Sequence, residues 1–159
     1  MTFKYIFQMV IAVIFFLLFS VCTWYEGSEI LDNPWEWKYS TYFSKASDDQ
    51  VMDAQDISDL DYFVYAAKFK PVFPVFMILT ALYLIILTGY ILFKGSIKCT
   101  ALFLSGLGVL FLLSSVFVSN TPTIGGTIFQ VFFLISGMIS IMGAALYYFW
   151  TSKGFKTEI

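Results

Sequence analysis

The chain has 159 residues, of which 59% are apolar and only 13% are charged, with a formal net charge of −2. A water-soluble domain of this length has too small an interior to bury so much apolar surface, so the composition excludes that class and indicates a membrane protein. The chain holds no histidine and all nine of its basic residues are lysine, which argues against His-ligated metal sites and against nucleic-acid recognition.

The first apolar run extends from Lys4 to Glu26, and no charged residue lies between them. A hydrocarbon core about 30 Å thick needs roughly 20 helical residues, so this run is long enough to cross it once. We therefore predict a first transmembrane helix within residues 1–25. A cleaved signal peptide or a lipoprotein signal is the competing interpretation. However, FSVCTW places Val21 before Cys22 and offers few of the small residues that cleavage requires.

An acidic, aromatic-rich segment at residues 26–70 follows this helix and carries ten acids and four lysines. Within DNPWEWKYS, Asn33 suits a helix cap and Pro34 suits the first helical position, which predicts a short helix. One face of that helix would carry Trp35, Tyr39 and Tyr42. In the alternative, an extended strand, one face would carry Trp35, Trp37 and Tyr39.

Five aromatic residues near the end of the first helix are candidates for interface or membrane-anchor contacts: Trp24, Tyr25, Trp35, Trp37 and Tyr39. Indoles and phenols concentrate at the headgroup level of a bilayer, so the simplest interpretation is an aromatic belt that anchors the segment to lipid. Tryptophan and tyrosine also dominate the contact hot spots between proteins, so a protein-binding patch is the second interpretation.

A second helix is predicted over residues 48–70, because Ser47 followed by Gln50 matches a capping box. Pro71 would end this helix, and its apolar stripe would consist of Ile57, Leu60, Val64 and Ala67. Six aspartates in and before this stripe suggest calcium binding. Their helical spacing and the lack of a nearby glycine favour a solvated acidic face instead.

Three further transmembrane helices are predicted from the remaining apolar runs, at residues 71–93, 99–118 and 126–150, before a tail at 151–159. The sequence SNTPTIGG separates the last two, since its asparagine, proline and glycine pair favour a turn. On the fourth helix a stripe of small residues is expected to pack against other helices, either within the bundle or in another copy, and consists of Ser136, Ser140 and Ala144.

The lysines outside the acidic segment flank the predicted spans on one side, at Lys4, Lys94, Lys98, Lys153 and Lys156. The positive-inside rule then places both termini in the cytoplasm and the acidic segment outside. The expected fold is an all-α integral membrane protein of the cell membrane, with four transmembrane helices and an acidic helical extracytoplasmic segment between the first two.

The stretch TWYEGSEILDNPWEWKYS, residues 23–40, lies directly behind the first predicted span. In this context it resembles the uncharacterised YjdJ-like family of small Bacillus membrane proteins, a domain of unknown function. The resemblance covers about residues 1–45, roughly a quarter of the chain. It implies a Gram-positive cell membrane and implies no activity, cofactor or site residue.

The leading functional hypothesis is a non-enzymatic envelope component that contacts the lipid bilayer and associates with another membrane protein or with itself. A small transporter or an oligomeric channel subunit is the alternative, although none of the predicted spans carries a charge at its centre. A membrane enzyme comes third, and its acid and base would be chosen among the carboxylates of Glu26, Glu29, Asp32 and Glu36. No cofactor, metal or nucleic acid is expected.

Overall fold

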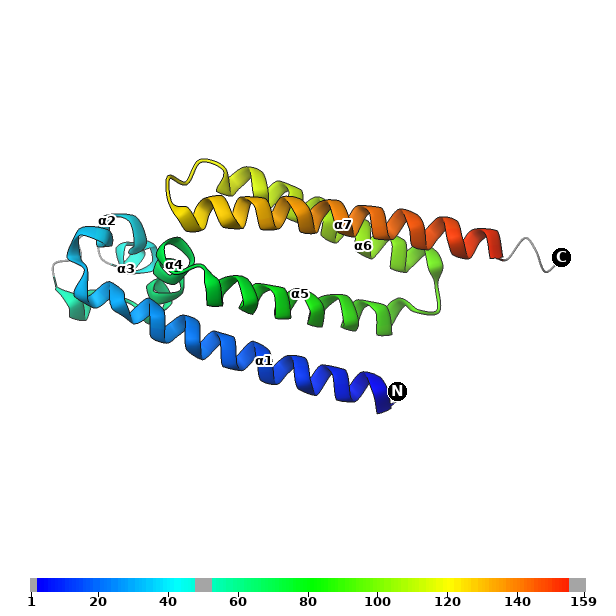
Figure 1. The fold of residues 1–159 in the computed structure, drawn as a ribbon, viewed down its shortest axis with the longest axis horizontal. Coiled ribbons are helices and arrows are strands. Elements are labelled where there is room, and N and C mark those ends of the chain that lie inside the picture. The colour runs from blue at the N-terminus through cyan, green and yellow to red at the C-terminus, as the bar shows by residue number, and fades with distance from the viewer. Residues whose placement is uncertain (1–2, 48–52, 155–159) are drawn as a thin grey trace. The chain divides into compact units, whose positions relative to one another are not determined.

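The computed structural model describes residues 3–47 and 53–154, and these residues form helices and turns without a strand (Figure 1). Four helices are long and apolar enough to cross a membrane: α1 (Phe3–Gly27), α5 (Val72–Phe93), α6 (Ile97–Val118) and α7 (Ile124–Gly154). The expectation of an all-helical chain with four such helices is confirmed.

In the part of the chain that the structure describes, six shorter helices lie between α1 and α5: η1 (Ser28–Asp32), η2 (Pro34–Glu36), α2 (Trp37–Ser40), α3 (Tyr42–Ser47), η3 (Ala54–Asp56) and α4 (Asp59–Phe69). The described part of residues 28–70 is called the cap below. The chain divides into two compact units, Met1–Leu82 with Pro122–Gly126 and Tyr83–Thr121 with Thr127–Ile159, so the whole cap belongs to the first unit together with α1.

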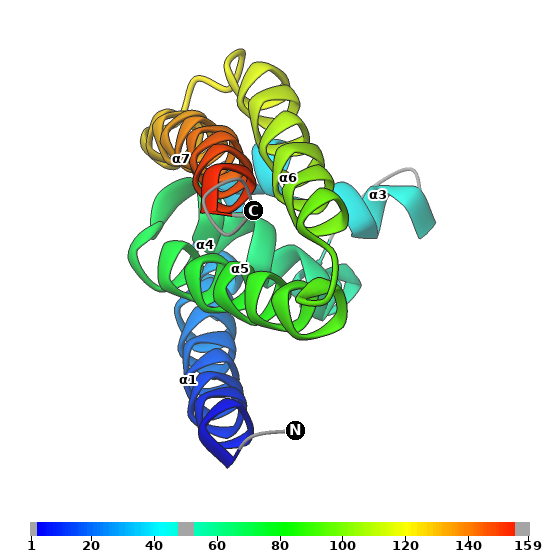
Figure 2. The same cartoon turned by 90° about the vertical axis from the view of Figure 1, so that its right-hand side faces the viewer.

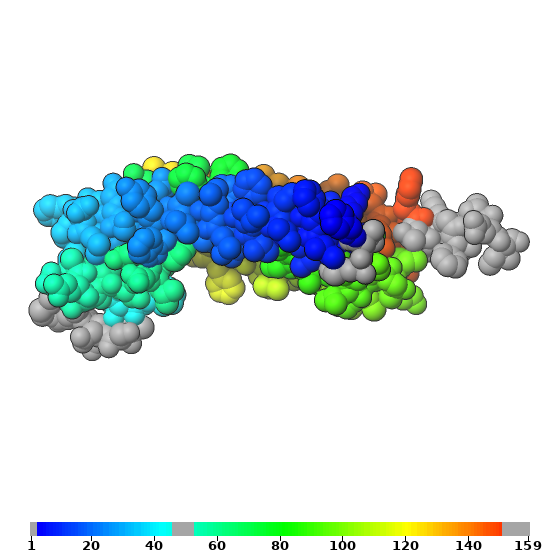
Figure 3. All heavy atoms as spheres, turned by 90° about the horizontal axis from the view of Figure 1, so that it is seen from below, coloured from blue at the N-terminus to red at the C-terminus, as the bar shows by residue number. Residues whose placement is uncertain are grey.

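Helix α1 is exposed along its length, which is the pattern expected of a helix that faces lipid. Its side chains form a continuous surface along the helix (Figure 3), and its buried residues are Ala12, Thr23 and Gly27. Within the first unit α1 meets the start of α5 through aromatic rings, because Phe19 lies 5.3 Å from Phe76 between ring centroids. Many of its other large apolar side chains are exposed.

The end of α1 crosses α4 at very short range through Gly27. A Cβ atom added at Gly27 would lie 2.0 Å from the carbonyl oxygen of Tyr62, so only glycine allows this approach. Next to the crossing, the ring of Trp24 lies 6.0 Å from the ring of Tyr62. The cap is therefore packed directly onto the end of the first long helix.

The predicted helix over residues 48–70 is wrong in its extent. Helix α4 begins only at Asp59, where the side chain of Ser58 accepts a hydrogen bond from the backbone N–H of Leu60. A capping box between Asp53 and Asp56 forms the separate turn η3 just before it, and the backbone at Ile57 is extended. Ser47 is the last residue of α3, and positions 48–52 of the prediction lie outside the described residues.

The expected apolar stripe changes with this later start. Leu60 is 54% exposed, and the buried residues of α4 are Asp61, Tyr62, Tyr65 and Ala66. Ile57 is buried as expected, but it lies before the helix instead of on it. The predicted stripe assumed one continuous helix, whereas the turn η3 and the extended backbone at Ile57 separate that stretch from α4.

The glycine pair at the start of α7 belongs to the helix and not to the preceding turn. The backbone N–H of Gly126 donates to the hydroxyl of Thr123, which caps α7. A Cβ atom at Gly125 would lie 1.9 Å from the carbonyl oxygen of Ala67 in α4. Close packing on the cap, and not turn formation, is therefore the role of Gly125.

In the second unit α6 and α7 pack closely through small residues. A Cβ atom at Gly108 would lie 2.6 Å from the side chain of Ile141, and one at Gly137 would lie 2.9 Å from that of Leu112. The hydroxyl of Ser115 in α6 donates to the carbonyl of Gln130 in α7 over 2.9 Å. Small residues thus allow this helix pair to approach, as they do in membranes generally.

Candidate functional site

The cap has its own hydrophobic core, which holds its short helices together. The core consists of Ile30, Ile57, Tyr62 and Tyr65, with Leu31, Trp37 and Phe69 packed against it. The indole N–H of Trp37 donates to the backbone carbonyl of Ile30 over 2.7 Å. Trp37, which was expected to make outside contacts, is therefore a packing residue of the cap.

A buried aspartate joins α4 to α3. Asp61 has no exposed surface, and its carboxylate accepts hydrogen bonds from the backbone N–H groups of Phe43 and Ser44 at 2.9 and 2.8 Å. The hydroxyl of Ser44 also donates to Asp61 and accepts from the backbone N–H of Ser58. The carboxylate thus satisfies the free N–H groups at the start of α3 and is favoured there by the helix dipole.

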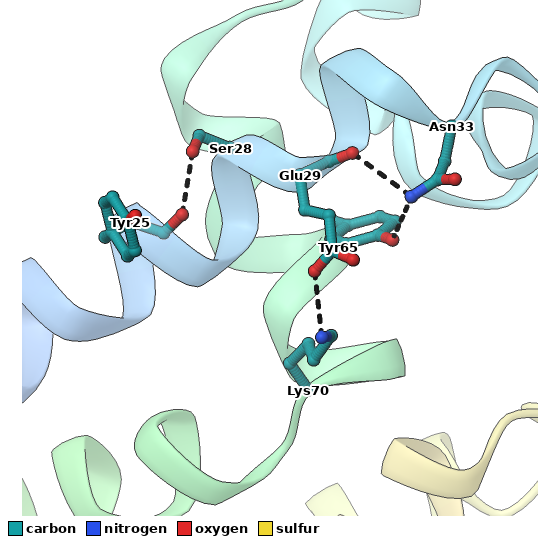
Figure 4. Close-up of polar contacts among 6 residues, drawn as sticks. All are labelled: Tyr25, Ser28, Glu29, Asn33, Tyr65 and Lys70. Atoms are coloured by element: carbon teal, nitrogen blue, oxygen red, sulfur yellow. Dashed lines mark hydrogen bonds and ion pairs between the residues drawn. The ribbon is translucent and has the colours of Figure 1, made fainter.

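A second polar cluster lies where α1 leads into the cap (Figure 4). The ammonium of Lys70 lies 2.9 Å from the carboxylate of Glu29. The side-chain amide of Asn33 donates to the carbonyl of Glu29 and to the phenol oxygen of Tyr65, at 3.3 and 3.1 Å. Asn33 was predicted to cap a helix, but its side chain makes no cap hydrogen bond and bridges η1 to α4 instead.

Two groups in this cluster, the phenol of Tyr65 and the ammonium of Lys70, have pKa values raised above their ordinary values. Burial, together with the neighbouring carboxylate of Glu36, raises the pKa of Tyr65, and the hydrogen bond to Glu29 raises the pKa of Lys70. Both groups therefore hold their protons more firmly than in an unfolded chain. This arrangement stabilises structure, and neither group becomes a proton donor or acceptor suited to catalysis near pH 7.

Four of the five aromatic residues expected at an interface are exposed, and the fifth, Trp37, packs against the core of the cap. Trp35 is 86% exposed, Tyr39 is 48% exposed and Tyr42 is 61% exposed. Trp24 and Tyr25, at the end of α1, are also exposed, although Trp24 contacts the cap through Tyr62 as described above. Trp35, Tyr39 and Tyr42 are all exposed, but they lie in η2, α2 and α3 and not on one face of a single short helix as predicted.

Three lysines gather around two of these tyrosines. The ammonium of Lys68 lies 4.4 Å from the ring centre of Tyr42, and it donates to the Tyr42 hydroxyl and to the backbone carbonyl of Tyr39. The ammonium of Lys38 lies 5.9 Å from the ring centre of Tyr39, and that of Lys45 donates to the carbonyl of Lys38. We call these five residues, Lys38, Tyr39, Tyr42, Lys45 and Lys68, the lysine–tyrosine patch.

The patch was not predicted from the sequence, because residues 26–70 were interpreted as a net acidic segment of ten acids and four lysines. Lys38 lies in α2 and Lys45 in α3, on either side of the break at Thr41, so no single helical spacing relates them. Lys68 joins them only through the tertiary contact of α4 with α2 and α3, which the sequence does not display.

The small residues of α7 lie mostly inside the chain. Ser140 and Ala144 are buried, and the hydroxyl of Ser140 donates to the carbonyl of Ser136 over 2.8 Å. Two of the three are therefore not available to another copy of the chain. Among residues 3–47 and 53–154, no cluster of three or more acidic or cysteine side chains is arranged to hold a metal ion.

Comparisons with known proteins place the first half of the chain in a family. Residues 6–93 match the family described as "Domain of unknown function (DUF4306)". The "Uncharacterized protein YjdJ" of Bacillus subtilis (strain 168) is 35% identical over 94 residues, which cover 58% of this chain and 84% of that relative. No solved structure matches.

The resemblance inferred from residues 23–40 is confirmed, and the match extends well beyond residue 45. It covers nearly all of α1, the whole cap and all of α5, whereas α6 and α7 lie outside it. The shared part is thus the cap with the two long helices that flank it. The chain belongs to the DUF4306 family, whose function is unknown.

Proposed function

We propose that the protein is a multi-pass membrane protein with both termini in the cytoplasm and its cap outside the cell membrane. Four helices of sufficient length and apolarity support the insertion. The lysines at Lys4, Lys94 and Lys98 support the orientation, because they flank the ends of the long helices opposite to the cap. The cap then stands at the outer surface.

The cap acts in this proposal as a non-enzymatic contact element that binds another membrane protein or a second copy of the chain. The observation that carries it is the exposure of Trp35, a large aromatic residue on a small domain whose core is already filled. Tryptophan is among the residues that contribute most to protein–protein contacts. Tyr39 is the second contact residue, whereas Trp37 is withdrawn from this role by its packing.

The alternatives have less support. A transporter needs polar groups that face a path, but the hydroxyls of Thr80, Ser105 and Ser114 donate to carbonyls of their own helices. For an enzyme that uses the cap carboxylates, Glu29 is paired with Lys70, and the raised pKa values of Tyr65 and Lys70 do not suit proton transfer near pH 7. The contact role therefore stands as the proposal.

Photocrosslinking in native membranes tests the contact role. The residue p-benzoylphenylalanine is introduced in place of Trp35 or, as a matched control, in place of Trp37. We expect a discrete protein adduct from position 35, identified by mass spectrometry, and only crosslinks within the cap from position 37. Lipid adducts alone from position 35 contradict the contact role.

A further inference from the structure

The lysine–tyrosine patch is held at the depth of the lipid headgroups by its position in the chain. Lys68 precedes Val72, the first residue of the long apolar helix α5, by four residues. Even a fully extended chain covers at most about 3.6 Å per residue, so the backbone of Lys68 lies within about 14 Å of the start of that helix. The long lysine side chain adds reach toward the headgroups.

Contacts from Lys68 bring the rest of the patch to the same level. Lys68 binds the ring and hydroxyl of Tyr42 at the start of α3 and the carbonyl of Tyr39 in α2. Figure 2 shows α3 to one side of α1 and α4.

Four of the seven carboxylates in the described cap have hydrogen-bond or ion-pair partners within the cap. Asp61 is buried against the start of α3, and Glu29 is paired with Lys70. Asp53 and Asp56 cap each other's turn in η3. These four carboxylates are therefore bound by groups other than the patch lysines, although the whole segment is acidic by composition.

We propose that the lysine–tyrosine patch binds the phosphate groups of anionic lipids in the leaflet at which the cap lies. Lysine is depleted in protein–protein interfaces, whereas lysines beside a membrane span attract anionic headgroups and tyrosines prefer the headgroup layer. These properties favour lipid over a protein at this patch. The inference rests on the proposed insertion of the long helices, but not on the protein contact at Trp35.

Crosslinking to lipid in a defined bilayer tests the patch. The full chain carries p-benzoylphenylalanine in place of Tyr42, which keeps an aromatic ring at that position. It is reconstituted in nanodiscs of phosphatidylcholine with or without phosphatidylglycerol. We expect phosphatidylglycerol adducts in excess of that lipid's share of the bilayer, measured by mass spectrometry. The excess should disappear near 1 M salt, where the screening length is about 3 Å.

Substitutions that remove or keep the lysine charges test whether the patch attracts anionic lipid or merely lies close to the bilayer. Each lysine near an anionic surface contributes about a fivefold preference. Lys38→Gln with Lys45→Gln should therefore lower the ratio of phosphatidylglycerol to phosphatidylcholine adducts, taken relative to the bilayer ratio, by up to roughly 25-fold. Arginine at both positions should restore it. The paired variant Lys94→Gln with Lys98→Gln, at the opposite end of α5, should leave it unchanged. If glutamine variants fold poorly, the arginine variants and the salt dependence of the crosslinking chain with all its lysines in place still decide.

The inference is overturned if the adducts follow the lipid composition without excess, or if the two glutamine substitutions change nothing. Labelling of a cysteine at position 35 from outside intact cells reports separately on the orientation. A cap that is labelled outside but shows no phosphatidylglycerol excess refutes the lipid site and leaves the proposed function standing.

Discussion

The close crossing of α1 and α4 makes Gly27→Ala the most informative single substitution. The added Cβ would lie 2.0 Å from the carbonyl oxygen of Tyr62, whereas real Cβ atoms essentially never approach another atom closer than 3.0 Å. The two helices must therefore separate by about 1 Å. Forcing an extra carbon into packed structure costs typically about 1–3 kcal/mol. Because the added carbon would meet backbone atoms, we take the upper part of that range, about 2–3 kcal/mol. Alanine is more favourable than glycine in a helix by about 1 kcal/mol, so the net cost is about 1–2 kcal/mol.

Gly143→Ala is the matched control, since a Cβ atom there would meet no other atom within 4 Å. Unfolding in mixed micelles, followed by far-UV circular dichroism, gives the free energy of unfolding of both variants. We expect Gly27→Ala to lower it by about 1–2 kcal/mol and Gly143→Ala to leave it equal or raise it by up to about 1 kcal/mol. A Gly27→Ala variant as stable as the control would refute the crossing of α1 and α4.

Three further predictions concern the cap. Asp61→Asn removes a charged acceptor from the buried N–H groups at the start of α3 and should lower the free energy of unfolding by about 1–3 kcal/mol, measured in the same micelles. Trp37→Phe removes the hydrogen bond to the buried carbonyl of Ile30 and should lower the free energy of unfolding by about 1–2 kcal/mol. Trp35→Phe, at an exposed position, should change it by less than about 0.5 kcal/mol. Equal effects of the two substitutions would contradict the assignment of Trp37 as packed and Trp35 as exposed. The raised pKa values of Tyr65 and Lys70 mean that the folded state retains protons that the unfolded chain releases, so their stabilisation is complete below about pH 10 and is lost as the pH rises further. Tyr65→Phe should make the decline in stability above pH 10 less steep, and an unchanged slope would show that this phenol is not responsible.

The long helices were predictable because their signal is local. An uninterrupted apolar run such as the one after Lys4 leaves a helix as the only backbone arrangement that satisfies its own polar groups in lipid. The start of α7 was placed slightly late, because Gly125 and Gly126 were interpreted as turn residues. Thr123 caps the helix before them, and Gly125 serves the contact with Ala67.

The cap was predictable in composition but not in arrangement. Ser47 with Gln50 and Ser58 are both plausible helix starts, and the turn that decides between them depends on Asp53 and Asp56 binding each other's backbone. Asp61 is one of six similar aspartates in its stretch, and only the tertiary contact with α3 distinguishes it.

The exposed candidates were found more easily than the packed ones. Helical spacing singled out Trp35, Tyr39 and Tyr42, which are exposed. It could not show that Trp37 is turned toward Ile30, because that contact depends on how η1 folds back. The lysine–tyrosine patch likewise depends on α4 and was out of reach of local patterns.

Cysteine accessibility in intact cells tests the central claim, that the cap lies outside the membrane, most directly. Cys22 and Cys99 are first replaced by alanine, and a single cysteine is then introduced by Trp35→Cys or by Gly95→Cys, two positions with open space around them. A maleimide that does not cross membranes should label position 35 in intact cells and position 95 only after lysis. Labelling of position 95 in intact cells, with position 35 protected until lysis, would contradict the account.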